Sequence, residues 1–141
     1  MITVKDIMKE AISSGACNNS GKATNWKSLC WLFFTPQGRE FCENNNFPSL
    51  DIFRQMKPHV YKHGVFVDAG DIELKNNANI AVIGNTNAHL LFDDNTKVHK
   101  VIIMHGGKVT IDARNYSVVL LVNVGNNNVE IINDKTARIL W

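Results

Sequence analysis

The first sixty residues place apolar side chains three or four positions apart, which is the spacing of α-helices. Four segments follow this pattern: residues 3–14, 24–34, 36–43 and 50–57. Polar residues suited to capping precede them, and Thr35 followed by Pro36 is the clearest helix start. Pro58 is expected to end the fourth helix, because proline lacks the N–H group that a continuing helix needs. The pattern predicts a mostly helical segment over residues 1–60.

The pattern changes near Gly64, where short β-branched runs begin to alternate with Asn, Asp and Gly. The strongest runs are residues 65–67, 80–83, 101–104 and 118–122. Between them a faint repeat reads polar, apolar, any residue, apolar. Its lines begin at residues 71, 89, 108 and 128, which are 18, 19 and 20 positions apart. The two sets together predict about eight short strands.

A repeat of nearly constant length is typical of stacked structural units, so it favours a β-solenoid. Stacking the lines would align two apolar columns: Ile72, Leu90, Val109 and Val129, then Leu74, Phe92, Ile111 and Ile131. Asn is abundant, with 18 in the chain and 12 of them between residues 76 and 133. Asn tolerates the left-handed backbone that coil corners need.

We therefore predict an α+β protein. A helical cap over residues 1–60 would plug the first coil of a right-handed β-solenoid of about four coils over residues 61–141. The alternative is an all-β sandwich with a helical N-terminal extension, in which the same strands pair as hairpins. In the solenoid the last coil ends at Leu140 and Trp141, so an apolar strand edge must fold back or meet a partner.

The amino-acid composition does not change the predicted fold. Of the 141 residues, 45% are hydrophobic and 20% charged, as in ordinary soluble domains. The net charge of +2 forms no basic face for nucleic acid. The longest apolar run, residues 29–34, is too short for a membrane span, and no signal peptide is visible. We expect a cytoplasmic protein that binds neither nucleic acid nor membrane.

Cysteine and histidine predict no metal site or cofactor. Cys17, Cys30 and Cys42 have no zinc or redox spacing, and we expect reduced, mostly buried thiols. The histidines in the repeat, His89, His99 and His105, fall in adjacent coils and lack carboxylate or thiol ligands at a suitable spacing.

Acidic residues near the first coils are the one candidate for chemistry. A glycoside hydrolase needs two carboxyl groups facing each other across a cleft. Asp68, Asp71, Glu73 and Asp93 could serve a small carbohydrate-binding or carbohydrate-cleaving β-helix protein. Strand alternation places Asp71 and Glu73 on the same outward face, where solvated acids also belong. Solvated surface residues therefore explain this set better.

The absence of a catalytic set, together with surplus apolar side chains, predicts a non-enzymatic interaction or self-assembly module. The expected partner is a second copy of the chain or another protein. The predicted interface residues are Trp26 and Trp31 on the helical side, and Leu140 and Trp141 at the last coil. A further alternative is an accessory protein of a phage or other mobile element, which genomic neighbourhood would test.

Overall fold

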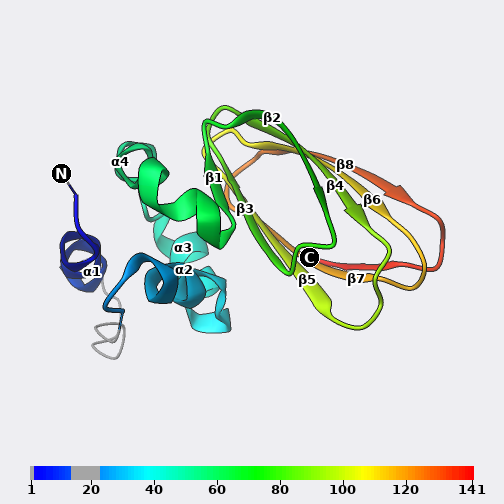
Figure 1. Ribbon diagram of the computed structural model, residues 1–141, viewed down its shortest axis with the longest axis horizontal. Helices are drawn as coiled ribbons and strands as arrows, with labels where there is room; N and C mark the ends of the chain where they lie inside the picture. Colours follow the sequence, from blue (N-terminus) through cyan, green and yellow to red (C-terminus); the bar gives the residue numbers. More distant parts are fainter. Residues whose placement is uncertain (1, 14–22) are drawn as a thin grey trace.

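A computed structural model describes residues 2–13 and 23–141, and in this part of the chain four α-helices precede two parallel β-sheets (Figure 1). The helices are α1 (Val4–Ser13), α2 (Trp26–Phe34), α3 (Pro36–Asn45) and α4 (Leu50–Val60), followed by the 3-10 turn η2 (Tyr61–His63). Side-chain caps begin all four: Thr3 accepts from the Asp6 N–H group, Asn25 from Ser28, Thr35 from Gly38 and Ser49 from Ile52. The four predicted helices are confirmed.

The predicted end of the fourth helix is wrong. Helix α4 continues past Pro58 to Val60. Proline stands in the last turn, where the helix loses only one backbone hydrogen bond. The Val60 side chain is fully buried in the core beneath the helix, and this burial offsets the loss.

The strands wind into coils, each of which contributes one strand to each sheet (Figure 1). The first sheet contains β1 (Val65–Val67), β3 (Asn79–Ile83), β5 (Val98–Met104), β7 (Val118–Asn123) and β9 (Arg138–Leu140) in that order. The second sheet contains β2 (Gly70–Lys75), β4 (Thr86–Phe92), β6 (Lys108–Ala113) and β8 (Asn128–Asn133). Every strand pair is parallel, whereas hairpins are antiparallel. The β-solenoid of about four coils is confirmed, and the sandwich is excluded.

The predicted register is wrong at β4. Ile72 pairs with Ala88 rather than Leu90, and Leu74 pairs with Leu90 rather than Phe92. The steps from Ile72 to Ala88, Val109 and Val129 are 16, 21 and 20 residues, so the first coil is shorter than the repeat indicated. A shift of two residues keeps every side chain on the same face of a strand. The apolar pattern therefore could not distinguish the two registers.

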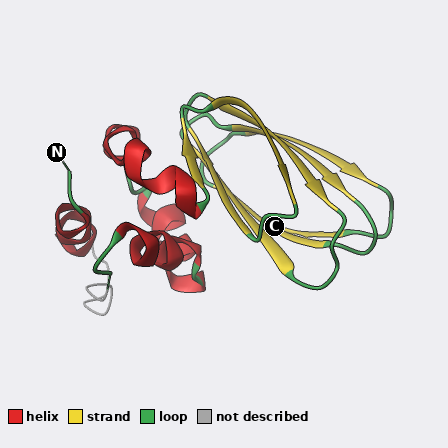
Figure 2. Cartoon of the chain, viewed as in Figure 1, coloured by secondary structure: helices red, strands yellow, loops and turns green. Residues whose placement is uncertain are grey.

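Two apolar cores lie on opposite faces of the first sheet. Alternate side chains of β3 show this: Ile80 and Val82 point into the solenoid, whereas Ala81 and Ile83 pack against the helices. The helices thus cover the outer face of this sheet, beside the coils (Figure 2). We had expected them to plug the edge of the first coil instead. A face that is apolar on four successive strands offers more area to bury than a strand edge does.

Asparagine and aspartate fix the coil corners, as the composition predicted. Asn76 and Asn115 have left-handed backbone angles. The Asn76 side chain accepts hydrogen bonds from the backbone N–H groups of Asp93 (2.9 Å) and Asp94 (3.2 Å), which ties one corner to the next. These contacts fix how the second of these corners stacks on the first.

Candidate interaction surface

In the described residues, the coil furthest along the chain has two strand edges without a partner strand. We call residues 128–141, which contain β8 and β9, the terminal coil. Within the described part of the chain, β8 pairs only with β6, and β9 pairs only with β7. The N–H and C=O groups along the far side of each strand therefore have no strand partner there. Such a row is a template for pairing with another chain.

The apolar core is unfinished at this coil. Val109 and Ile111 of β6 are at most 1% exposed, because a coil stacks on each side of them. Their neighbours in the next coil, Val129 and Ile131, are only half-buried. Ala137 and Ile139 are half-buried in the same way on the other sheet. A further layer of apolar side chains would complete their burial.

Three large apolar side chains add to this edge. Ile132 is 50% exposed, Leu140 42% and Trp141 73%. Leu140 follows Leu120 in the register of the first sheet, and Val98, 48% exposed, lies on the same outer face. Sequence analysis did not identify Ile132 or Val98. The sequence alone could have indicated Ile132, because it is an apolar residue at a position where the alternation along the strand predicts a polar one.

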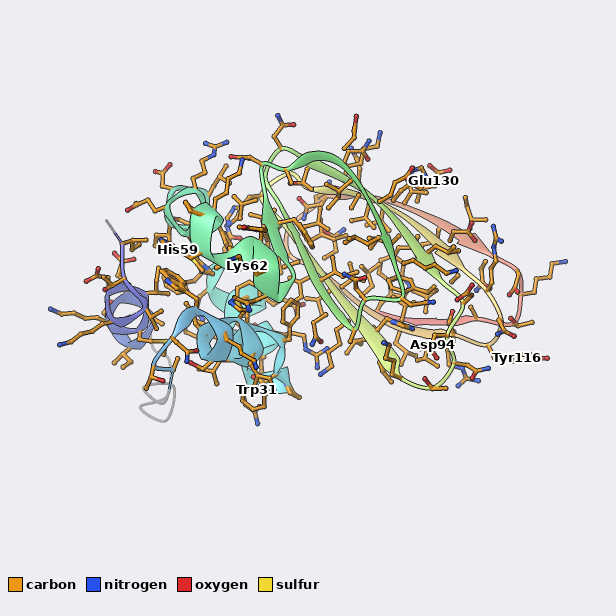
Figure 3. The ribbon with its side chains drawn as sticks, in the orientation of Figure 1. Trp31, His59, Lys62, Asp94, Tyr116 and Glu130 are labelled. Atoms are coloured by element: carbon orange, nitrogen blue, oxygen red, sulfur yellow. The ribbon has the colours of Figure 1, made fainter. Side chains whose placement is uncertain are left out.

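The four predicted interface residues do not lie together. Leu140 and Trp141 belong to the terminal coil, as described above. Trp31 is 66% exposed and points outward from α2 (Figure 3). Trp26 is half-buried and stacks on His59, with ring centroids 4.7 Å apart and planes 3° from parallel. Trp26 therefore contributes to the packing of α2 on α4.

Asp68 joins the helices to the first coil. Its carboxylate accepts hydrogen bonds from Arg54 Nε (2.7 Å) and from the Asn85 N–H group (2.8 Å). These two contacts, the Arg54 bond foremost, lower the pKa of Asp68. Lys57 Nζ also donates to the Asp68 backbone oxygen (3.0 Å). The carboxylate thus already serves the contact between α4 and the solenoid.

The other three acids of the carbohydrate hypothesis are spread along the second sheet. Asp71 accepts from Asn87 Nδ2 (3.0 Å) at the start of β2, and Glu73 lies two residues further on the same outward face. Asp93 follows the far end of β4, where Asn76 Nδ2 donates to it (2.6 Å). The hypothesis stays a prediction, but no facing pair of carboxylates comes from these positions.

The three histidines of the repeat do not converge. His89 is exposed on the outward face of β4, and His99 is buried inside the solenoid. His105 lies in the turn after β5, with Nε2 2.7 Å from the Pro48 oxygen. Among residues 2–13 and 23–141, no group of three His, Cys, Asp or Glu side chains is placed to hold a metal ion.

The cysteines in the described part of the chain are free and buried, as predicted. Burial raises the pKa of Cys30 and that of Cys42 to about 12 each, so both thiols stay protonated. Cys17 lies outside the described residues.

Comparisons with protein families, with curated proteins and with solved structures found no match to this chain. Within residues 2–13 and 23–141, every helix is too short or too polar to cross a lipid bilayer. The physical features of the terminal coil therefore carry the functional argument.

Proposed function

We propose that this protein is a non-enzymatic assembly module whose terminal coil pairs with a second copy of the chain. The half-buried apolar layer carries the proposal: Val129, Ile131, Ala137 and Ile139 have the spacing of an interior layer, and no further layer among the described residues covers them. The terminal coil of a second copy would supply partner strand edges for backbone hydrogen bonds. It would also supply a half-buried apolar layer of the same kind, which could pack against the first.

Charge favours a tail-to-tail arrangement of the two copies. On the outward face of the second sheet, four residues pair with one another across successive strands: Glu73, His89, Thr110 and Glu130. Head-to-tail stacking in the same register would place Glu130 (Figure 3) beside Glu73 of the next copy. Like charges directly opposite each other destabilise a sheet. Antiparallel pairing centred on Ile131 avoids this contact, because Glu130 then faces Ile132 of the second copy.

The size of the end face predicts a weak dimer. Six residues of β8 span about 20 Å, and packed sheets lie about 10 Å apart. Adding the outward side chains roughly doubles this cross-section, to about 400 Å² per copy or about 800 Å² in total. Stable interfaces usually bury about 1,200–2,000 Å². We therefore expect a reversible dimer with a Kd in the micromolar range or weaker, in which Trp141 supplies much of the contact.

Sedimentation velocity over a concentration series up to the millimolar range tests the proposal. The matched variants are Trp141→Ala and Trp31→Ala, since both side chains are tryptophans with similar exposure, 73% and 66%. We expect Trp141→Ala, and deletion of Leu140 and Trp141, to weaken association at least fivefold. We expect Trp31→Ala to leave it unchanged. A protein that stays monomeric throughout, or one in which only Trp31→Ala weakens association, would overturn the proposal.

A further inference from the structure

The helical segment contains an apolar cavity that is separate from the terminal coil. Its volume is about 390 Å³, and side chains from all four helices line it. The walls include Met8 and Ala11 of α1, Leu29 of α2, Phe41 of α3 and Met56 of α4. Binding sites for small molecules have volumes of this order, and apolar side chains predominate in their walls.

We propose that this cavity binds a small aliphatic molecule whose polar end is not anionic. At about 30 Å³ per water-sized group, 390 Å³ holds roughly a dozen non-hydrogen atoms. A straight chain of about ten carbons matches that size. The proposal does not depend on self-association, because no residue of the terminal coil lines the cavity.

The polar part of the lining determines which end group fits. Thr35, Gln37, Asn44 and Asn45 line it with polar side chains. The Thr35 hydroxyl already caps α3 and donates to the Leu32 oxygen, and Asn45 Nδ2 donates to the Phe41 oxygen. The amides of Gln37 and Asn44 can therefore hydrogen-bond to an alcohol or an amine. Among residues 2–13 and 23–141, Glu40 is the one charged side chain in the lining, and these residues contribute no Lys or Arg to it. A carboxylate ligand would therefore meet an anion and find no cation to pair with, whereas an ammonium group would meet its counter-ion.

The cavity favours reversible binding over covalent attachment. Cys42 is the one thiol that the described residues contribute to the lining, and burial raises its pKa to about 12. Only a thiolate is an effective nucleophile, so this side chain acts as part of the apolar wall.

Isothermal titration calorimetry of the full chain with decanol, decylammonium and decanoate, each below its micelle concentration, tests the proposal. We expect decanol to bind with a Kd on the order of 100 µM. Glu40 is exposed, so its charge has a modest effect. We expect decylammonium to bind about tenfold more tightly than decanoate. Absence of binding by decanol, or tightest binding by decanoate, overturns the proposal.

Two pairs of variants locate the site. Ala11→Leu replaces a methyl group in the wall with an isobutyl group and should weaken decanol binding at least tenfold. Ser13→Leu adds leucine to an exposed position of the same helix, outside the lining, and should have no effect. Glu40→Gln should remove the preference for decylammonium over decanoate and keep decanol binding. Glu43→Gln, one turn away on α3 and outside this lining, should change neither. Equal effects within either pair would contradict the assignment, and the exposed Glu40 variant decides the matter if Ala11→Leu does not fold.

Discussion

His99 should be the polar residue whose loss destabilises the solenoid most. Its side chain is 0% exposed, inside the coils. Nδ1 lies 3.0 Å from the Asn77 carbonyl oxygen, and Nε2 lies 3.0 Å from the Asp94 carbonyl oxygen. The ring also packs on Phe92, with centroids 4.5 Å apart. One imidazole thus connects the backbone corners of two successive coils, because each ring nitrogen lies within hydrogen-bond distance of a carbonyl oxygen from a different corner.

Substitution of His99 by Leu keeps a side chain of similar size but removes both ring nitrogens that contact the carbonyl oxygens. Leaving a buried polar group without its partner costs about 1–3 kcal/mol. Two carbonyl groups are affected, and the better burial of leucine offsets part of the loss, so we expect a net destabilisation of about 2–4 kcal/mol. Gln in place of His99 should give an intermediate value, because its amide group retains donors but not the geometry to reach both carbonyl groups.

Urea unfolding followed by circular dichroism at pH 7 measures this cost. His89→Leu is the matched control, because the same substitution is made at an exposed position of the neighbouring strand β4. It should change the unfolding free energy by no more than about 0.5 kcal/mol. If the two leucine variants differ by less than about 0.5 kcal/mol, the hydrogen bonds of His99 do not stabilise the fold and the reasoning is refuted.

The remaining predictions concern burial and titration. Leu90→Ala, at a position 1% exposed inside the solenoid, should cost about 2–5 kcal/mol in urea unfolding. Leu91→Ala, next to it on the outward face, should cost less than half as much. Hydrogen bonds from Thr136 lower the pKa of Asp134 to about 2 from 3.8, so its contribution to stability is present above pH 4 and is lost as pH falls toward 2. The stability difference between wild type and Asp134→Asn should shrink over that range, and a difference that does not vary with pH would contradict the assignment. Cys30 and Cys42 should resist iodoacetamide at pH 8 until urea is added, as peptide mass spectrometry would show; rapid native alkylation would be incompatible with their burial.

Local signals predicted the helices well. The caps at Thr35 and Ser49 use hydrogen bonds between residues three apart, so the sequence carries the whole interaction. The end of α4 was missed because it depends on Val60, whose burial against the first sheet is a long-range contact. Similarly, the repeat predicted parallel coils, yet the register at β4 depended on how tightly the first corner turns.

The candidate interaction surface and the cavity also include features that the sequence indicated and features that it did not. Leu140 and Trp141 follow the last repeat, and the structure has both side chains exposed; their place in an interface stays a prediction. The position of Trp26 did not follow, since its partner His59 is 33 residues away in the sequence, on another helix. The apolar cavity also went unpredicted, because four helices must be placed in space before any void between them exists.

The sequence by itself thus determined the order of elements and the stacking of parallel coils. These follow from alternation, capping and repeat, which act within a strand, a turn or a neighbouring coil. The tertiary structure decided the register of the first coil, the side of the solenoid that the helices cover and the residues that line the cavity. These depend on which apolar faces meet, and burial is a non-directional force that many pairings of the same pattern can satisfy.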